Sequence, residues 1–326
     1  MTATTPIISI IIRCRNEERH IGRLLEGILS QQRKDAEIIV VDSGSTDATL
    51  LIARRYPVKI ISVEPASFSF GYALNRGCEE AQGEFLVFVS AHVYPVYRNW
   101  LDEMLQPFAD EKVALVYGRQ CGDIRTKYAE RRIFAKWFPS ESSACQAHAF
   151  CNNANTAVRK CVWMTHRYDE SLTGLEDLDW ARRVKALGYR IAYQAQAEVV
   201  HVHEETYRQI YTRYYREAIA MKRMFPEEQF SFFDLIRALT GNVISDWRYA
   251  LHEHVLHREW IRIVRFRTMQ FVGTFKGYRM RIGMLPELRD RFYYPDGRPP
   301  ATASVEAATN NLIIDYSRQD GGHDDN

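Results

Sequence analysis

The feature that most constrains the fold is a regular alternation of apolar runs and helical patterns over the first 118 residues. The predicted strands are residues 7–12, 37–41, 58–63, 84–90 and 113–118. Between them, apolar side chains recur at helical spacing, for example over residues 71–82 and 95–108. Because the runs are apolar on both faces, we expect buried, parallel strands. The pattern therefore predicts an α/β fold with a mostly parallel central sheet flanked by helices.

Three polar residues come at or just after the ends of predicted strands: Arg13, Asp42 and His92. Ligands of open α/β sheets bind beyond the carboxyl ends of the strands. We therefore expect these three side chains to share one crevice.

The second half of the chain begins with an irregular segment, residues 119–173, that is rich in small, polar and aromatic residues. A loop-rich segment of this length is usually functional. A helix is predicted from Glu176 to about Gly188, followed by a strand, a further short strand at 198–203 and an aromatic, basic helix at 207–225. Pro226 marks a boundary.

Beyond this boundary, residues 230–280 are predicted to form two or three helices, and the residues after Pro295 to form a loose tail. The helices carry a basic surface made by Arg258, Arg262, Arg265, Arg267, Lys276 and Arg279. Such a surface fits anionic lipid head groups. It also fits a helical cap with solvated arginines, or the surface of a homodimer.

Composition narrows the class of partner and the compartment. The 43 basic and 41 acidic residues nearly cancel, which argues against a nucleic-acid partner. The six cysteines form no C-x-x-C pair, so reduced, cytoplasmic thiols are expected. No stretch approaches the roughly 20 apolar residues that span a bilayer. We expect a cytoplasmic protein, soluble or at the inner face of the membrane.

Five motifs occur in a fixed order: "ISIIIRCRNEE", "EIIVVDSGSTD", "ALNRGCEEAQGEFLVFVS", "GLEDLDWARRVKALGYR" and "VVHVH". Together they resemble family 2 of the inverting glycosyltransferases, which have the Rossmann-like GT-A fold. "FSFGYALNRG" and "HVHEETYRQIYTRYY" are most similar to the rhamnosyltransferase-like branch of bacterial polysaccharide biosynthesis. The resemblance implies transfer of a sugar from a UDP- or dTDP-type donor to a hydroxyl of a saccharide or lipid-linked acceptor in surface polysaccharide synthesis.

The resemblance also implies a domain division. Residues 1–225 would form the GT-A domain, with a nucleotide-binding half (1–118) and an acceptor half (119–225). A basic helical extension (226–295) and a flexible tail (296–326) would follow.

For the donor nucleotide, the resemblance implies contacts with Arg13, Asp42, Ser43, Asn75, Arg76, Ser90 and Ala91. The Asp42 carboxylate can accept the imide hydrogen of uracil or thymine, and Arg76 can donate to phosphate. Two simpler interpretations stay open. "DSGSTD" is also an ordinary strand-to-helix turn, and Arg76 is also an ordinary solvated helix residue.

Most relatives end the fourth strand with Asp-x-Asp, whose second Asp binds a divalent cation; this chain has Ser90-Ala91-His92. The resemblance implies Mn²⁺ or Mg²⁺, held by His92, His203 and His201. A protonated His92 could instead stabilise phosphate directly, or serve only as a hydrogen-bonded strand end. We expect His201 and His203 to point to opposite faces of their strand, with His203 the one that faces the crevice.

The resemblance assigns the catalytic base to Asp177, next to Glu176 at the start of a helix. Acids in a first helical turn also simply complement the helix dipole. Candidate acceptor contacts in the irregular segment are Trp137, His148, Asn153 and Asn155.

Two other functions fit parts of the sequence. An inactive sugar-nucleotide-binding regulatory module fits the missing Asp pair, but such a module does not need Asp177. A nicotinamide-dependent oxidoreductase is disfavoured because no G-x-G-x-x-G follows a predicted strand.

Overall fold

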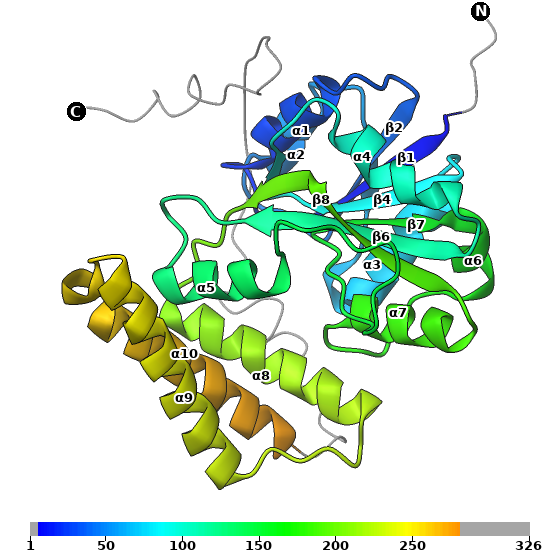
Figure 1. Cartoon of the computed structure of the whole chain (residues 1–326). Coiled ribbons are helices and arrows are strands. Elements are labelled where there is room, and N and C mark those ends of the chain that lie inside the picture. Colours follow the sequence, from blue (N-terminus) through cyan, green and yellow to red (C-terminus); the bar gives the residue numbers. More distant parts are fainter. Residues whose placement is uncertain (1–5, 281–326) are drawn as a thin grey trace, which may run out of the picture.

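The computed structural model describes residues 6–280 and is built around one eight-stranded sheet (Figure 1). The strands are β1 (Ile8–Cys14), β2 (Ala36–Asp42), β3 (Lys59–Ser62), β4 (Phe85–Ser90), β5 (Val93–Pro95), β6 (Val113–Cys121), β7 (Asn155–Arg159) and β8 (Arg190–His201). Their order across the sheet is β3-β2-β1-β4-β7-β6-β8-β5. β1, β2, β3, β4, β6 and β8 run in one direction, whereas β7 and β5 are antiparallel to their neighbours. The predicted, mostly parallel sheet is confirmed.

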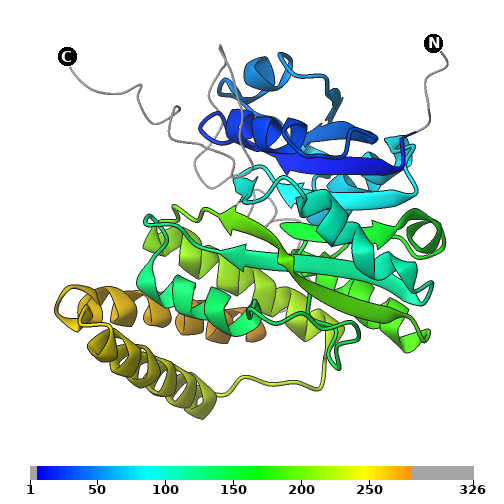
Figure 2. The ribbon, with the colours of Figure 1, turned by 45° about the horizontal axis from the view of Figure 1, so that its top comes forward.

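Helices cover both faces of the sheet (Figures 1 and 2). The elements are α1 (Ile21–Leu29), α2 (Thr49–Ala53), α3 (Phe70–Glu80), α4 (Trp100–Leu105), α5 (Tyr128–Trp137), α6 (Lys160–Thr165) and α7 (Glu176–Ala186). Alternate residues of β1 point to opposite sides of the sheet. Ile10 and Ile12 pack in a core with α1 and α4, while Ile11 packs in a second core with α3, α6 and α7. The strands are thus apolar on both faces, as their sequences predict.

The irregular segment is more ordered than predicted. It contains α5, β7 and α6, and β7 lies in the middle of the sheet, between β4 and β6. The five residues of β7, NTAVR, are too few and too mixed in polarity to stand out in the sequence. The separate strands predicted around 190 and at 198–203 are in fact the single strand β8, which ends at His201.

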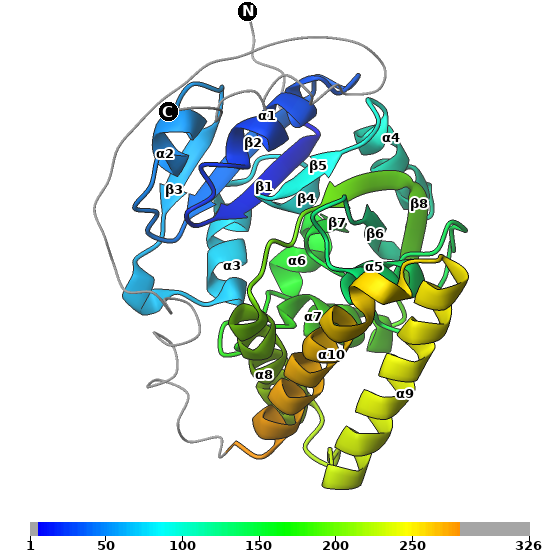
Figure 3. The ribbon, with the colours of Figure 1, turned by 90° about the vertical axis from the view of Figure 1, so that its left-hand side faces the viewer.

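Three further helices, α8 (Tyr207–Met224), α9 (Phe232–His252) and α10 (Leu256–Tyr278), form a layer beside the sheet-containing part (Figures 1 and 3). α10 packs closely on α8 at Gly273, which has no side chain. A Cβ at this position would lie only 2.6 Å from the carbonyl oxygen of Tyr211. Arg267 is not part of the predicted basic surface: it is buried and forms an ion pair with Asp246 at 2.8 Å. The predicted tail, 296–326, and residues 281–295 of the predicted extension lie outside the described residues.

Within residues 6–280, no helix has both the length and the apolar character needed to cross a membrane. All six cysteines lie in this range and are unpaired.

Candidate active site

A cleft opens where β1, β4 and β8 end. It consists of a cavity of about 640 Å³ and an adjoining one of about 230 Å³. Both cavities are lined by Arg13, Glu17, Phe70, Ser90, His92 and Arg216. The larger cavity is also lined by Glu176, Asp177, His201 and His203. Residues from separate strand ends and the acidic start of α7 therefore face one space.

Asp177, at the start of α7, is held by two backbone amides. Its Oδ2 accepts a hydrogen bond from the Asn153 amide at 3.0 Å, and its Oδ1 accepts one from the Leu178 amide at 2.8 Å. Leu175, the residue just before α7, has a φ of 58°, in the left-handed region that non-glycine residues rarely adopt. Burial, and then the charge of Glu176, raise the pKa of Asp177 to about 7. A carboxyl group with a pKa near 7 can accept and release a proton at neutral pH.

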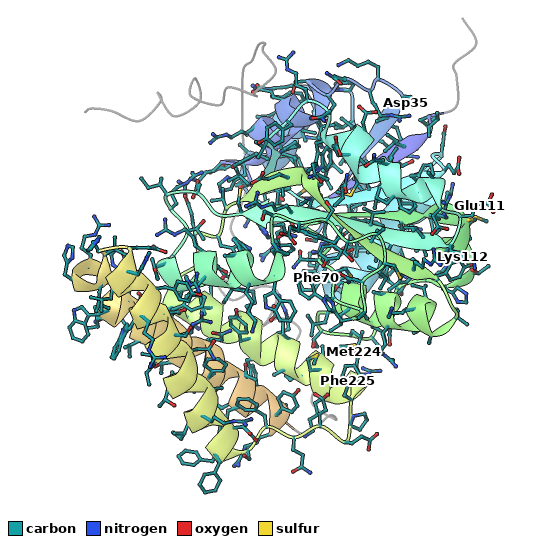
Figure 4. The ribbon with its side chains drawn as sticks, viewed as in Figure 1. Asp35, Phe70, Glu111, Lys112, Met224 and Phe225 are labelled. Carbon is teal, nitrogen blue, oxygen red and sulfur yellow. The ribbon has the colours of Figure 1, made fainter. Side chains whose placement is uncertain are left out.

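Two arginines line the same cavity as these acids. Arg13, at the end of β1, lies 3.8 Å from Glu176 and places its guanidinium 4.0 Å from the ring centre of Phe70. Arg216 of α8 contacts the same ring at 4.5 Å. Figure 4 labels Phe70, which lies between the sheet and α8. The two guanidiniums are fork-shaped donors that could pair with an anionic group, although the larger cavity is also lined by several carboxylates.

Three histidines form a cluster on the other side of the cleft. The ligand atoms of His92, His201 and His203 all lie within 4.8 Å of one another. The rings of His92 and His201 are stacked with 5.2 Å between their centres, and those of His201 and His203 are 4.0 Å apart. The prediction that His201 and His203 point to opposite faces is wrong. Residues two apart on a strand share a face, and β8 ends at His201.

Each of these rings binds an oxygen through Nδ1. His92 contacts Glu17 at 2.8 Å, His201 contacts Gln120 at 2.7 Å and His203 contacts Glu130 at 2.7 Å. The Nε2 atom of His201 is buried and has no hydrogen-bond partner among the described residues. Three imidazoles oriented in this way fit a divalent metal ion, which the resemblance implies.

The pKa values of His92 and His201 are shifted in opposite directions. Burial opposes protonation of His92, but the Glu17 carboxylate raises its pKa above the ordinary value. Burial, followed by the neighbouring His203 and His92, lowers the pKa of His201 well below its ordinary value. His201 is therefore neutral and able to act as a ligand.

A network of ion pairs contacts the cluster through His203. Glu130, His203 and Glu205 also lie close enough to hold a metal ion, but Arg213 occupies this space and pairs with both carboxylates at 2.6 Å. Burial opposes ionisation of Glu130, yet Arg213 and His203 lower its pKa to about 2. This network is a buried set of ion pairs that holds His203 in place.

Several predicted nucleotide contacts are not among the residues that line the two cavities. Asp42 is 2% exposed, and its carboxylate accepts hydrogen bonds from the amides of Gly44 and Ser45, which is the role of a turn residue. Asn75 is buried and holds Trp163 and the loop that follows it. Arg76 is exposed on α3 and pairs with Glu79.

Ser43 and Ser90, in contrast, line the smaller cavity, and Ala91 is fully buried between Ser90 and His92. Among the predicted acceptor contacts, Asn153 lines the larger cavity. Its side-chain nitrogen and oxygen are buried and unpartnered among the described residues.

The other predicted acceptor contacts are not brought to the cleft. Asn155 is fully buried and bonds to Trp100 and to the backbone of Arg119 and Ala197. Trp137 stacks on Phe150 at the surface, and His148 contacts Trp137 edge-on.

Glu17 and Arg216 line the cleft and Gln120 contacts His201, yet none of these three is predicted from the sequence. Glu17 lies within the first motif, and Arg216 directly follows the last motif quoted above, so their neighbourhoods were visible in the sequence. Gln120 has no such signal, because only the pairing of β6 with β8 brings it to His201.

Comparison with known proteins gives a family match and several relatives. Residues 9–171 match the family model described as Glycosyl transferase family 2. The O-antigen chain rhamnosyltransferase WbaN of Salmonella anatum is 31% identical over 57% of this chain. This match spans 62% of WbaN, less than two thirds of its length. RfbN of Salmonella typhimurium, also an O-antigen chain rhamnosyltransferase, is 24% identical over 64% of this chain and 70% of its own length.

Two solved structures share the fold. The mannosyltransferase PcManGT from Pyrobaculum calidifontis, in complex with GDP-Man and Mn²⁺, gives a TM-score of 0.55 at 18% identity, covering 90% of this chain and 89% of that one. TarS of S. aureus in complex with UDP-GlcNAc gives 0.51 at 18% identity, covering 88% and 93%. The fold is thus that of the GT-A glycosyltransferases. The chain belongs to glycosyl transferase family 2.

Proposed function

We propose that this protein transfers a sugar from a nucleoside-diphosphate sugar to an acceptor hydroxyl with inversion of configuration, and that Asp177 is the general base. The observation that carries the proposal is that Asp177 and His92 line the same cavity, which Arg13 also lines. An acceptor base and a pyrophosphate-binding group must face one space for this reaction.

In the proposed reaction, the acceptor oxygen attacks the anomeric carbon from the side opposite the diphosphate. The bond between this carbon and the acceptor oxygen forms as the bond to the diphosphate oxygen breaks. The leaving nucleoside diphosphate takes the electron pair, and Asp177 takes the hydroxyl proton. The two backbone amides bonded to Asp177 keep its carboxylate oriented toward the cleft.

On the donor side, Arg13 and Arg216 would face the diphosphate, while Ser43 and Ser90 would contact the nucleotide in the smaller cavity. His92, His201 and His203 would hold a divalent cation. Such an ion acts as a Lewis acid that stabilises negative charge on the leaving diphosphate. Asn153 would contact an acceptor or sugar hydroxyl through its unpartnered amide.

For the substrate class, we favour a UDP- or dTDP-linked hexose or deoxyhexose and a saccharide or lipid-linked acceptor of surface polysaccharide synthesis. The support is the similarity to WbaN and RfbN, both O-antigen chain rhamnosyltransferases.

We also propose that α9 and α10 rest on the inner face of the membrane. Their exposed apolar side chains are Phe232, Phe233, Ile236, Ile244, Leu251, Trp260 and Ile261, and Arg258 and Arg262 lie on the same helix as the last two. Apolar side chains beside arginines suit an anionic lipid surface. Phe233→Ser with Trp260→Ser should reduce sedimentation with anionic vesicles. Met164→Ser, at an exposed site on α6, should not. Equal sedimentation of all three proteins would favour a helical cap or a homodimer surface.

The proposed activity is tested by incubating the purified protein with UDP-, dTDP- and GDP-sugars, with and without chelator, and measuring release of nucleoside diphosphate. Slow donor hydrolysis that is lost in Asp177→Asn supports the transferase. Tight binding of a sugar nucleotide without turnover on any donor or acceptor would favour the regulatory module instead.

A further inference from the structure

We propose that the three-histidine cluster selects a divalent transition-metal ion and discriminates against Mg²⁺, and that Gln120 is a positioning residue for this site. This inference rests on the proposed function, because it names the cofactor of the same cleft. In each of the three rings, Nδ1 already takes part in a hydrogen bond, and the other nitrogen is left to bind an ion.

Gln120 determines the tautomer of His201. The Gln120 side chain is 1% exposed, and its Nε2 donates to Asn152 Oδ1 at 3.3 Å. Its orientation leaves Oε1 toward His201 Nδ1, at 2.7 Å. An amide oxygen only accepts hydrogen bonds, so Nδ1 of His201 carries the proton. The lone pair of His201 is therefore on Nε2, the buried atom without a partner among the described residues.

The other two rings are fixed by carboxylates. Glu17 accepts from Nδ1 of His92, and Glu130 accepts from Nδ1 of His203. Arg213 pairs with the same Glu130 carboxylate at 2.6 Å and helps to hold it in this position. In all three rings, Nε2 remains as the ligand atom. Partners of this kind orient metal-binding histidines and make them more basic.

A set of three imidazole nitrogens is a poor match for Mg²⁺. Magnesium prefers oxygen ligands, keeps several of its waters and is usually bound by carboxylates and phosphates. Glu17 and Glu130 contact the rings on their Nδ1 side, and Glu205, which also lies close to His203, pairs with Arg213. Imidazole suits later first-row divalent ions, whose affinities rise from Mn²⁺ toward Co²⁺ and beyond.

The cluster is also held rigidly. His201 is 4% exposed and stacks between His92 and Phe134, with 5.2 and 5.7 Å between ring centres. Little ordering of side chains is needed before an ion binds. We therefore expect binding in the absence of any sugar nucleotide.

The experiment measures metal binding directly. Chelator-treated full-length protein without an affinity tag is titrated with Mn²⁺, Co²⁺, Zn²⁺ or Mg²⁺, and bound metal is quantified by equilibrium dialysis and elemental analysis. We expect one ion per chain, weakest binding for Mg²⁺, and Co²⁺ tighter than Mn²⁺. A visible Co²⁺ spectrum of nitrogen ligation should persist in a large excess of Mg²⁺. Mg²⁺ binding as tight as that of Mn²⁺, or no stoichiometric ion at all, would overturn the inference.

Variants test the residues. His92→Ala should lose the stoichiometric ion, whereas His148→Ala, at an exposed site, should keep it. Gln120→Leu should weaken binding by about 10- to 100-fold, the usual effect of losing such a partner. Gln120→Glu, which still accepts from Nδ1, should restore most of it. If Gln120→Leu binds Co²⁺ as the unaltered protein does, Gln120 has no positioning role.

The two proposals can fail separately. If the protein releases nucleoside diphosphate from a donor but binds Mg²⁺ as well as Co²⁺, the metal inference fails and the transferase stands. If it binds Co²⁺ selectively but turns over no donor in any metal, the transferase fails and the metal site stands.

Discussion

The Oδ2 atom of Asp177 and the backbone nitrogen of Asn153 are joined by a hydrogen bond of 3.0 Å. This bond links the start of α7 to the loop that leads into β7, and it fixes one carboxylate oxygen before any substrate arrives. The Leu178 amide fixes the other oxygen. Asp177 is thus held by groups that do not titrate, while its pKa is set by burial and by Glu176.

Replacing Asp177 with Asn should reduce kcat by roughly 10²- to 10⁴-fold, the usual contribution of a general base. The donor dissociation constant should change little, because Asp177 faces the acceptor in the proposed reaction. Nucleoside diphosphate release and donor titration measure the two quantities. Glu141→Gln, at an exposed site, is the matched control. Full activity in Asp177→Asn would exclude this residue as the base.

The effect of the same variant on stability should depend on pH. The folded-state pKa of Asp177, about 7, lies above its ordinary value of 3.8, so folding favours the protonated carboxyl. That contribution to stability is fully present below pH 3.8 and is lost as the pH rises through about 7. The effect of Asp177→Asn on the free energy of unfolding should therefore be more favourable at pH 8 than at pH 5 by about 1–2 kcal/mol, less than the full shift because the side chain is only half-buried. Urea unfolding at pH 5 and pH 8 checks this; an equal effect at both pH values would contradict it.

The pH dependence of activity should report the same carboxyl. The base must be ionised, so kcat/KM should rise with pH through about 7 and then level off. Glu176→Gln removes a charge that raises the pKa of Asp177, and the rise should move to lower pH. A profile that does not move in Glu176→Gln would show that the rise belongs to another group.

The fold was largely predictable, because most of the parallel strands are long apolar runs separated by helical patterns. The exceptions are short or composite elements. β5 has three residues, β7 has five, and both are antiparallel strands whose place in the sheet depends on partners far along the chain. A local pattern carries no information on such pairing.

For the site, some residues could be predicted from the sequence and others could not. Residues at strand ends, such as Arg13 and His92, follow from topology, and they do line the cleft. Asn75 and Asn155 are polar residues within the quoted motifs or loops, but each proves to be a buried structural amide. The sequence shows that a polar residue is present, and only the three-dimensional contacts show whether its hydrogen bonds are already used.

Asn75→Ala should therefore lower stability and leave the site intact. The Asn75 amide bonds to Trp163 Nε1, to Glu170 and to the backbone of Tyr168, and the side chain is 1% exposed. Its loss leaves buried donors and acceptors unpaired, which costs about 2–4 kcal/mol in total. Urea unfolding measures the loss, and donor binding at low temperature should match that of the unaltered protein. Normal stability with impaired donor binding would instead show that Asn75 contacts the nucleotide.

Two arginines that were both predicted to meet the nucleotide should now behave differently. Arg13 lines both cavities, whereas Arg76 is exposed on α3 and pairs with Glu79. Arg13→Ala should weaken donor binding by roughly 10- to 100-fold, since hydrogen bonds to charged groups contribute about 1.5–3 kcal/mol. Arg76→Ala should stay within about twofold, as an exposed ion pair contributes little.

The Arg13 variant has a second expected effect that a purely structural role would not produce. The positive charge of Arg13 lowers the pKa of Asp177, in opposition to burial and Glu176. Its removal should move the rise of kcat/KM to higher pH, the reverse of the shift in Glu176→Gln. The pH profiles of the two variants, measured at saturating donor, separate this effect from weaker binding. Shifts in the same direction would contradict the arrangement in which Arg13 and Glu176 act with opposite sign on Asp177.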